Sequence, residues 1–294
     1  MTSLQDLEAA VTAGRALSRA EAERVAACPD LPSVGMLGEL ARTKRHGRRV
    51  TYVRVREVAR DEAIEPSDAG EIRLIGTPLT VDEGRARVQA AVQAAQGRVV
   101  TGFCLGDLWH HAGADAAALE NFAAALKSAG LDAVAEAPLD VLGDRAVSAV
   151  NAAARAGLAV RTATVTRAAF ADRLDLIERA IAVQRETGAF TAFAPLPRLD
   201  PHEEPATGYD DVRTVALARV MCGEIASIQV DWVLYGPKLA QVAIAYGADD
   251  LDRIPASSAP DLGRRRSARE EIERHIRAAF AEPVERDGRF EPRI

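Results

Sequence analysis

Cysteine is scarce in this chain, and the few cysteines lie far apart. The sequence contains Cys28, Cys104 and Cys222, with no CxxC pair, no CxxxCxxC triad and no cysteine–histidine pair at zinc-ligand spacing. This excludes the sequence signature of a structural zinc site, and we assign no metal ligand. An odd, scattered set of thiols is typical of small, buried hydrophobic side chains.

Long apolar runs are also lacking. No stretch approaches the roughly 18 uncharged apolar residues that a membrane span requires. The first residues, MTSLQDLEAAVTAGRALS, carry acidic side chains and lack the apolar segment of a secretory signal. We therefore expect a cytoplasmic protein that does not associate with membranes.

Lysine is rare, whereas arginine is abundant. Only Lys44, Lys127 and Lys238 are lysines among the 37 basic residues, and the formal net charge is −6. The arginines alternate with aspartate and glutamate along the expected helices, which predicts solvated, salt-bridged faces. We therefore expect no nucleic-acid partner.

From residue 50 onward, short β-branched runs alternate with longer alanine- and leucine-rich segments of helical period. The expected strands are 50–55, 71–75, 99–104, 132–136, 158–165, 190–196 and 227–233. Such alternation predicts βαβ units and a parallel sheet. Seven or eight units favour a (β/α)8-type TIM barrel over a doubly wound sheet, and no GxGxxG motif follows the first strand.

The barrel is expected to lie between two helical extensions. Residues 1–49 read as helices, one of which begins with a capping box of Ser18 and Glu21. The barrel is assigned to residues 50–254, and residues 255–294 are expected to form a basic linker, GRRR, followed by a C-terminal helix and tail.

Four ordered motifs identify a family resemblance. They are RETGAFTAFAPL, TGYDDVRTVALAR, DWVLYGPKLAQVA and GADDLD, all within residues 161–254. This stretch resembles the second half of the radical S-adenosylmethionine (SAM) barrel enzymes of futalosine-type menaquinone biosynthesis, aminofutalosine synthase and dehypoxanthine futalosine cyclase. The deazaflavin-forming synthase is a more distant relative. The resemblance implies a TIM barrel, an iron–sulfur cluster that binds SAM, and a futalosine-like nucleoside ligand.

The sequence departs from this family where the cluster belongs. The family places CxxxCxxC just after the first barrel strand, whereas here no cysteine lies between Cys28 and Cys104. Only the 15 residues from Arg56 to Gly70 separate the first two expected strands. A crossover needs at least about 10–12 residues, so no room remains for both a cluster loop and a full helix. We expect a barrel that is shortened or distorted near its first two strands and that uses neither the cluster nor SAM.

Ligand-facing groups of a TIM barrel lie at the carboxyl ends of its strands. The substrate-binding candidates expected there, or on the first turn of the following helix, are Asp107, Glu136, Arg167, Trp232, Lys238 and Asp249. Trp232 would offer a stacking surface for a purine or aryl ring. For each charged candidate the alternative is a solvated loop or a bracing contact at the barrel rim, and no catalytic residue is assigned.

Three interpretations of function remain open at this point. The first is a non-radical binding or partner subunit, a pseudoenzyme that holds a futalosine-like ligand or pairs with an active radical SAM paralogue or with itself. The second is an enzyme of another class, a lyase, hydrolase or isomerase that uses Asp107, Glu136 and Arg167 in acid–base chemistry. The third is that the cluster segment has been removed from a longer natural sequence.

Overall fold

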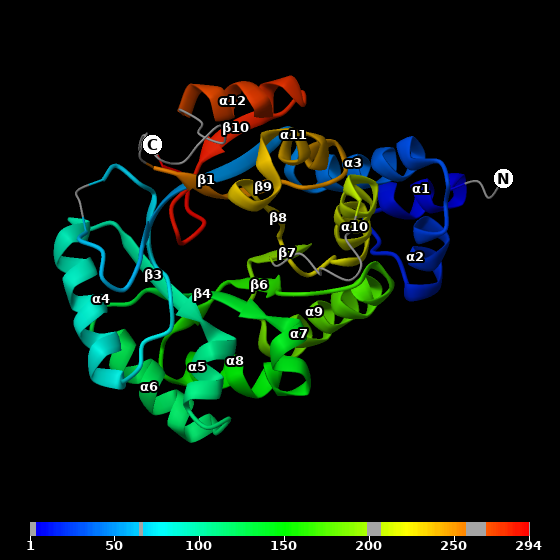
Figure 1. The fold of residues 1–294 in the computed structure, drawn as a ribbon. Coiled ribbons are helices and arrows are strands. Elements are labelled where there is room, and N and C mark those ends of the chain that lie inside the picture. Colours follow the sequence, from blue (N-terminus) through cyan, green and yellow to red (C-terminus); the bar gives the residue numbers. More distant parts are fainter. Residues whose placement is uncertain (1–3, 65–66, 199–206, 257–268, 294) are drawn as a thin grey trace.

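Eight parallel strands close into a barrel in the computed structural model of the chain, which describes residues 4–64, 67–198, 207–256 and 269–293 (Figure 1). In order around the barrel they are β1 (Arg49–Val58), β2 (Glu71–Leu74), β3 (Val99–Cys104), β4 (Ala133–Pro138), β6 (Thr162–Val165), β7 (Ala192–Pro197), β8 (Ser227–Asp231) and β9 (Asp250–Pro255). The barrel closes because β9 pairs with β1. The two-residue strand β5 (Ala159–Val160) pairs with β4 beside this ring. The predicted TIM barrel is confirmed.

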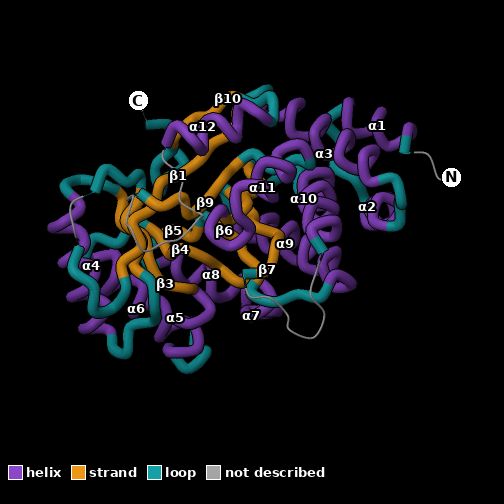
Figure 2. Tube along the Cα trace, turned by 45° about the horizontal axis from the view of Figure 1, so that its top comes forward, coloured by secondary structure: helices purple, strands orange, loops and turns teal. Residues whose placement is uncertain are grey.

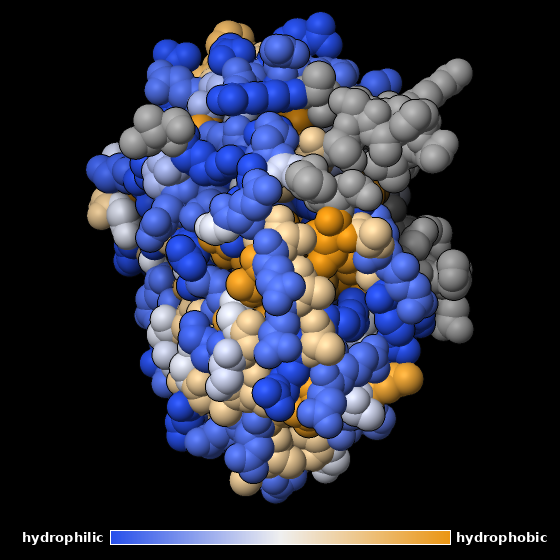
Figure 3. Space-filling model, turned by 90° about the vertical axis from the view of Figure 1, so that its left-hand side faces the viewer, coloured by the Kyte–Doolittle hydropathy of each residue, from blue (hydrophilic) through white to orange (hydrophobic). Residues whose placement is uncertain are grey.

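Helices form an outer layer around the strands (Figure 2). They are α4 (Val81–Ala95), α5 (Leu105–His111), α6 (Ala116–Ser128), α7 (Leu139–Leu142), α8 (Ala146–Arg155), α9 (Arg173–Thr187), α10 (Gly208–Met221) and α11 (Trp232–Ala245). Local sequence explains where several begin. The side chains of Thr80, Asp115 and Thr207 accept hydrogen bonds from the first turns of α4, α6 and α10. Seen from the side of α4, the surface is largely hydrophilic, with apolar patches between polar side chains (Figure 3).

In the described residues before β1, the chain forms three helices. They are α1 (Gln5–Thr12), α2 (Arg19–Ala26), which begins with the predicted capping box, and α3 (Leu31–His46). Helix α3 packs against α10 and α11. Gly38 permits this close approach, because a Cβ atom there would collide with the backbone carbonyl of Tyr246.

The connection between β1 and β2 is short, as the sequence predicted. Its described residues, 59–64 and 67–70, contain turns but no helix. The barrel is therefore shortened at this point, where a regular (β/α)8 fold has its first outer helix.

The chain after the barrel contains more than the predicted linker and helix. Helix α12 (Arg269–Ala278) is followed by a strand, β10 (Glu282–Glu285), which pairs in parallel with β1. The strand was not expected from the sequence, and the predicted basic linker GRRR lies outside the described residues. No helix in the described part of the chain is long and apolar enough to cross a membrane.

Candidate functional site

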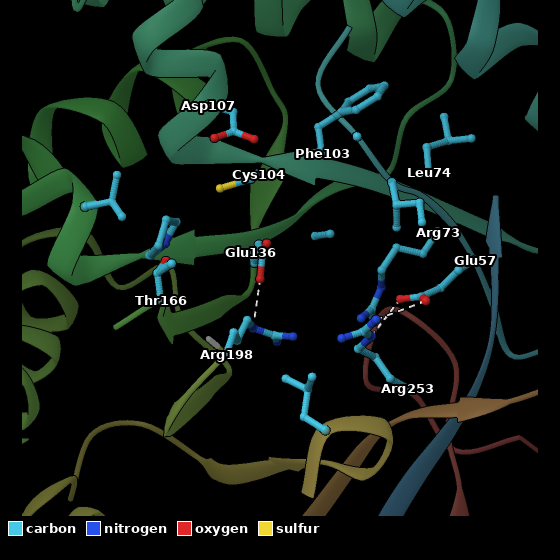
Figure 4. A pocket seen from close by; sticks show the side chains of 16 residues that line it. Glu57, Arg73, Leu74, Phe103, Cys104, Asp107, Glu136, Thr166, Arg198 and Arg253 are labelled. Carbon is cyan, nitrogen blue, oxygen red and sulfur yellow. Dashed lines mark hydrogen bonds and ion pairs between the residues drawn. The ribbon is translucent and has the colours of Figure 1, made fainter. Parts of the chain in front are cut away.

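A cavity of about 470 Å³ opens at the carboxyl ends of the barrel strands, where ligands bind in this fold (Figure 4). It has a charged wall and an apolar wall. Its lining residues are Glu57, Arg73, Leu74, Ile75, Gly76, Phe103, Cys104, Asp107, Ala135, Glu136, Pro138, Val141, Thr166, Arg198, Leu234 and Arg253.

The charged wall is a chain of alternating acids and arginines. The Arg253 guanidinium donates to both oxygens of Glu57, at 2.7 and 3.1 Å, and to Asp231 Oδ2 at 3.0 Å. Arg198 donates to the same Asp231 oxygen at 2.9 Å and forms an ion pair with Glu136 at 2.8 Å. These residues come from five strands or strand ends, so only the closed barrel brings them together.

Arg73 and its two acidic partners form the floor of the cavity. Arg73 donates to both oxygens of Asp252, at 2.9 and 2.8 Å, and to Glu71 at 2.7 Å. Burial alone would raise the pKa of Asp252, but the charges of Arg73 and Arg198 outweigh it and hold that pKa below its usual range. Asp252 is therefore ionised at neutral pH and fixes Arg73 in place.

The apolar wall carries a thiol. Burial, followed by the nearby charge of Glu136, raises the pKa of Cys104 to about 12. The thiol is therefore protonated at neutral pH, which argues against a nucleophilic role.

Two lining residues have backbone conformations that side-chain-bearing residues rarely adopt. Phe103, within β3, has φ of 65°, and Arg253, within β9, has φ of 58°. Such conformations cost of order 1–3 kcal/mol each and concentrate at functional sites. At Arg253 hydrogen bonds offset the strain, because the side chain reaches both Glu57 and Asp231.

Two of the sequence-predicted site residues line the cavity. Glu136, within the second half of β4, and Asp107, in the first turn of α5, both point into it. Asp107 Oδ2 accepts a hydrogen bond from Thr77 at 2.6 Å. Arg167 is exposed and does not line the cavity, but its neighbour Thr166 does. The Arg167 backbone N–H donates to Asp140 at 2.7 Å.

The placement of three other predicted residues needs correction. Trp232 has an exposed fraction of 0% and packs edge-on against His275 of α12, so it offers no stacking surface to the cavity. Leu234, two residues further along α11, faces the cavity in its place.

Lys238 and Asp249 also lie elsewhere. Lys238 lies just after a kink of α11 at Gly236 and borders a separate groove of about 390 Å³ with Tyr209 and Val242. Asp249 immediately precedes β9 and therefore lies at the opposite end of the barrel, buried against Arg219.

Sequence reasoning missed three residues of the charged wall and floor, namely Glu57, Arg73 and Arg253. Alternation gave no signal for Glu57 or Arg253, because Glu57 directly follows Arg56 and Arg253 directly follows Asp252. For Arg73 a signal was present, because the charged residues Glu71 and Arg73 alternate with apolar residues in EIRL, which forms a buried strand. In a parallel barrel every second residue points into the lumen, so such charges must meet one another there.

The residues present do not fit a cubane iron–sulfur cluster. Cys28 follows α2 and Cys222 ends α10, and both are buried away from Cys104 at the end of β3. The cavity thus holds one thiol, whereas the family's cluster takes three. In the part of the chain that the structure describes, no three His, Cys, Asp or Glu side chains gather in a way that could hold a metal ion.

Comparison with known proteins finds a family model that matches the C-terminal part of the chain. Residues 191–294 match the family described as the CofH/MqnC C-terminal region. Over these residues the chain is similar to the CofH and MqnC proteins. The resemblance drawn from its sequence motifs is thereby confirmed.

Two kinds of curated protein are similar to this chain. A 5-amino-6-(D-ribitylamino)uracil–L-tyrosine 4-hydroxyphenyl transferase of Methanococcoides burtonii is 36% identical over 135 residues, which are 40% of this chain and 37% of the relative. The aminodeoxyfutalosine synthase of Streptomyces coelicolor is 32% identical over 140 residues, 40% of this chain and 36% of the relative. The alignments thus span about a third of the length of these relatives, and about half of another transferase, from Methanosarcina mazei.

Solved structures agree on the fold. Methylornithine synthase has a TM-score of 0.68 at 13% identity and covers 95% of this chain and 97% of its own. A hydrogenase maturase, HydG, has a TM-score of 0.66 at 11% identity, over 95% of this chain and 75% of its own. At such low identity these likenesses concern the barrel alone.

Proposed function

We propose that this CofH/MqnC-type barrel is a pseudoenzyme that binds a small, uncharged or cationic ligand rich in hydrogen-bond donors, and that it does so without radical chemistry. The observation that carries the proposal is the state of the charged groups in the cavity. Each arginine of the cavity is already paired with a carboxylate, whereas two carboxylates keep oxygens to which nothing in the described residues donates. These two are Asp107 and Glu136.

The balance of charge favours the same class of ligand. The lining contains three arginines and three carboxylates, and three further carboxylates, Glu71, Asp231 and Asp252, lie directly behind the arginines. Six acids against three arginines make the cavity acceptor-rich and negative. A phosphate group would be repelled there, whereas hydroxyl, amino and ring N–H groups would find acceptors.

The apolar wall is suited to a planar ring. Leu74, Phe103, Pro138 and Leu234 supply apolar side chains to the lining of the same cavity. The substrates named for the transferase relatives, 5-amino-6-(D-ribitylamino)uracil and L-tyrosine, each combine a ring with a donor-bearing chain. We propose that the ligand of this chain belongs to that chemical class.

The pathway-level form of the proposal is an association with futalosine-type menaquinone biosynthesis. The aminodeoxyfutalosine synthase relative supports it. On this proposal the ligand is a futalosine-like nucleoside, and the partner is an active radical SAM paralogue or a second copy of the chain.

A second candidate function is acid–base catalysis as a lyase, hydrolase or isomerase in the same cavity. The observation that favours it is the pair of strained residues, Phe103 and Arg253, at the cavity wall. In this case Glu136 and Asp107 would exchange protons with the ligand, and turnover of a bound probe would distinguish enzyme from binding protein.

Isothermal titration calorimetry tests the binding proposal. The probes are 5-amino-6-(D-ribitylamino)uracil, which is uncharged, and L-tyrosine and aminodeoxyfutalosine, which each carry a carboxylate. The phosphate ester of 5-amino-6-(D-ribitylamino)uracil is the matched anionic counterpart. We expect 5-amino-6-(D-ribitylamino)uracil to bind more tightly than the two carboxylate-bearing probes, and its phosphate ester not to bind.

The variants Glu136→Gln and Asp107→Asn should each weaken binding about tenfold, because a hydrogen bond to a charged group contributes about 1.5–3 kcal/mol. Glu186→Gln, at an exposed position on α9, is the matched control and should leave the affinity unchanged. Failure of every probe to bind at millimolar concentration, equivalent to an affinity weaker than about −4 kcal/mol, would overturn the proposal.

A further inference from the structure

The C-terminal tail, residues 282–293, forms part of the barrel wall at its amino-terminal end (Figure 1). Thr51 of β1 pairs with β9 on one side and with β10 on the other, and Val55 pairs with β9 and β2 in the same way. Strands β10 and β2 therefore share one edge of β1. The tail fills the part of that edge which the four-residue strand β2 leaves open.

Beyond β10 the tail turns under the barrel, and the side chain of Arg286, the first residue after the strand, enters the lumen. Arg286 has an exposed fraction of 2% and donates to the two oxygens of Asp250, both at 2.6 Å. The ring of Phe290 covers the guanidinium at 3.8 Å from below. Gly288 permits this fit, because a Cβ atom there would lie 2.9 Å from Val99.

Arg286 lies directly below the floor of the ligand cavity. A small internal space of about 10 Å³ is bordered by Arg286 and Phe290 on the side of the tail and by Arg73 on the other. Arg73 also lines the ligand cavity. A single layer of side chains therefore separates the tail arginine from the ligand site.

The charges of this layer form one buried network. Two arginines, Arg73 and Arg286, donate hydrogen bonds to three carboxylates, Asp250, Asp252 and Glu71. The positive charge of Arg286 acts on all three carboxylates, beyond its direct partner Asp250. Thr51 and Gln229 also donate to Asp250, at 2.6 and 2.7 Å, but neither carries a charge.

We propose that Arg286 is a positioning residue for the ligand cavity: it keeps Arg73 at the cavity floor and sets the electrostatic potential above it. Without Arg286, the three carboxylates would keep Arg73 as a hydrogen-bonded cation and Arg198 as a looser ion-pair partner, 3.8 Å from Asp252. Arg73 would then be drawn toward Asp250, and the cavity would become more negative. The proposal takes the cavity to be the ligand site of the proposed function, but its test needs no ligand.

Cys104 lines the cavity and can report its potential. Cationic, neutral and anionic methanethiosulfonate reagents all react with the same thiolate. The thiolate fraction therefore cancels in the ratio of two reaction rates, and a change in that ratio between variants reports the electrostatic potential at the thiol. Loss of one charge through Arg286→Met should raise the cationic-to-neutral rate ratio about fivefold, as expected for a unit charge acting across ~15 Å at an effective dielectric constant near 20.

Two variants at Asp250 test whether the rate ratio changes in the direction that the charge predicts. Asp250→Asn keeps the shape of the side chain, removes a negative charge and should lower the same ratio about fivefold. The double variant Arg286→Gln with Asp250→Asn is charge-balanced and should return the ratio to within about twofold of wild type. If the tail only stabilised the fold, the two single variants would not shift the cationic-to-neutral rate ratio in opposite directions. The double variant would then not restore the wild-type ratio either.

The controls separate charge at Arg286 from charge anywhere in the tail. Arg286→Lys should keep the wild-type ratio, and so should Arg289→Met, which removes a half-exposed tail arginine paired with Asp132. Labelling of a Cys104→Ala protein gives the background of the other two thiols. If Arg286→Met does not fold, Asp250→Asn and the double variant decide the question. Ratios within twofold of wild type for both Asp250→Asn and Arg286→Met would overturn the proposal, whether or not any probe binds the cavity.

Discussion

Arg198 and Arg253 share a single oxygen atom of Asp231, at 2.9 and 3.0 Å. The other oxygen of Asp231 accepts the backbone N–H of Leu234 at 3.0 Å and caps α11. One buried carboxylate thus joins two strands of the cavity wall to a helix terminus. We therefore expect the order of the charged wall to depend on it.

Asp231→Asn tests this dependence, because asparagine can still cap the helix while it removes the charge. Two partly buried arginines would then face each other with one acid fewer, and we expect a loss of about 3 kcal/mol in the free energy of unfolding. The measurement is urea denaturation followed by circular dichroism. The matched control is Asp175→Asn, which removes a largely exposed partner of Arg19 and should cost less than about 1 kcal/mol. Equal losses for the two variants would contradict this role of Asp231.

The absence of a cysteine triad after β1 leads to a prediction about metal content. Anaerobic reconstitution with iron and sulfide, followed by desalting and iron analysis, should leave the protein with substoichiometric iron and no cluster absorbance. The physical reason is that the thiols lie on three separate elements, and a cubane needs three of them at one point. About four irons per chain would show that this interpretation is wrong.

The partly buried thiol of Cys104 should show a high apparent pKa. With a pKa of about 12, its rate of reaction with iodoacetamide should rise about tenfold for each pH unit between pH 7 and 9.5, without a plateau. The sign for stability follows from linkage. A thiol pKa raised above the unfolded value of about 8.5 contributes stability that is complete below pH 8.5 and is lost as the pH rises toward 12. A plateau below pH 9.5, absent in Cys104→Ala, would contradict the burial of this group.

The close contact of α3 with the segment that follows α11 gives a packing prediction. Gly38→Ala should destabilise the protein by about 1–3 kcal/mol, although alanine is the better helix former by about 1 kcal/mol, because its Cβ atom would collide with the carbonyl of Tyr246. Thermal or urea unfolding measures the change. Thr43→Ala, at an exposed position of the same helix, should be close to neutral. A stabilised Gly38→Ala protein would mean that α3 does not approach α11 this closely.

Much of the barrel was predictable because its signals are local. Strand and helix alternation, and caps such as Ser18 with Glu21 at the start of α2, are properties of a few neighbouring residues. The shortened β1–β2 connection followed from its length alone. By contrast, β9 looked like an acidic turn and β10 like part of a tail. Both strands exist because they pair with β1, about 200 or more residues earlier in the chain, and no local pattern contains that pairing.

The candidate site divides in the same way. The sequence by itself determined that polar residues such as Asp107 and Glu136 would end at the carboxyl face of the barrel, because the end of a strand is a local property. It determined the absence of a cysteine triad as well. Only the tertiary structure decided which side chains meet: Arg198, Asp231 and Arg253 follow or belong to three different strands, and they become partners because β7, β8 and β9 are neighbours. It also decided that Trp232 turns outward to His275 while Leu234 turns inward, since the direction of a side chain at a helix start depends on how the helix packs. Such contacts join segments that are far apart in the sequence and meet only when the barrel closes. The residue types and spacing within one segment therefore do not predict them.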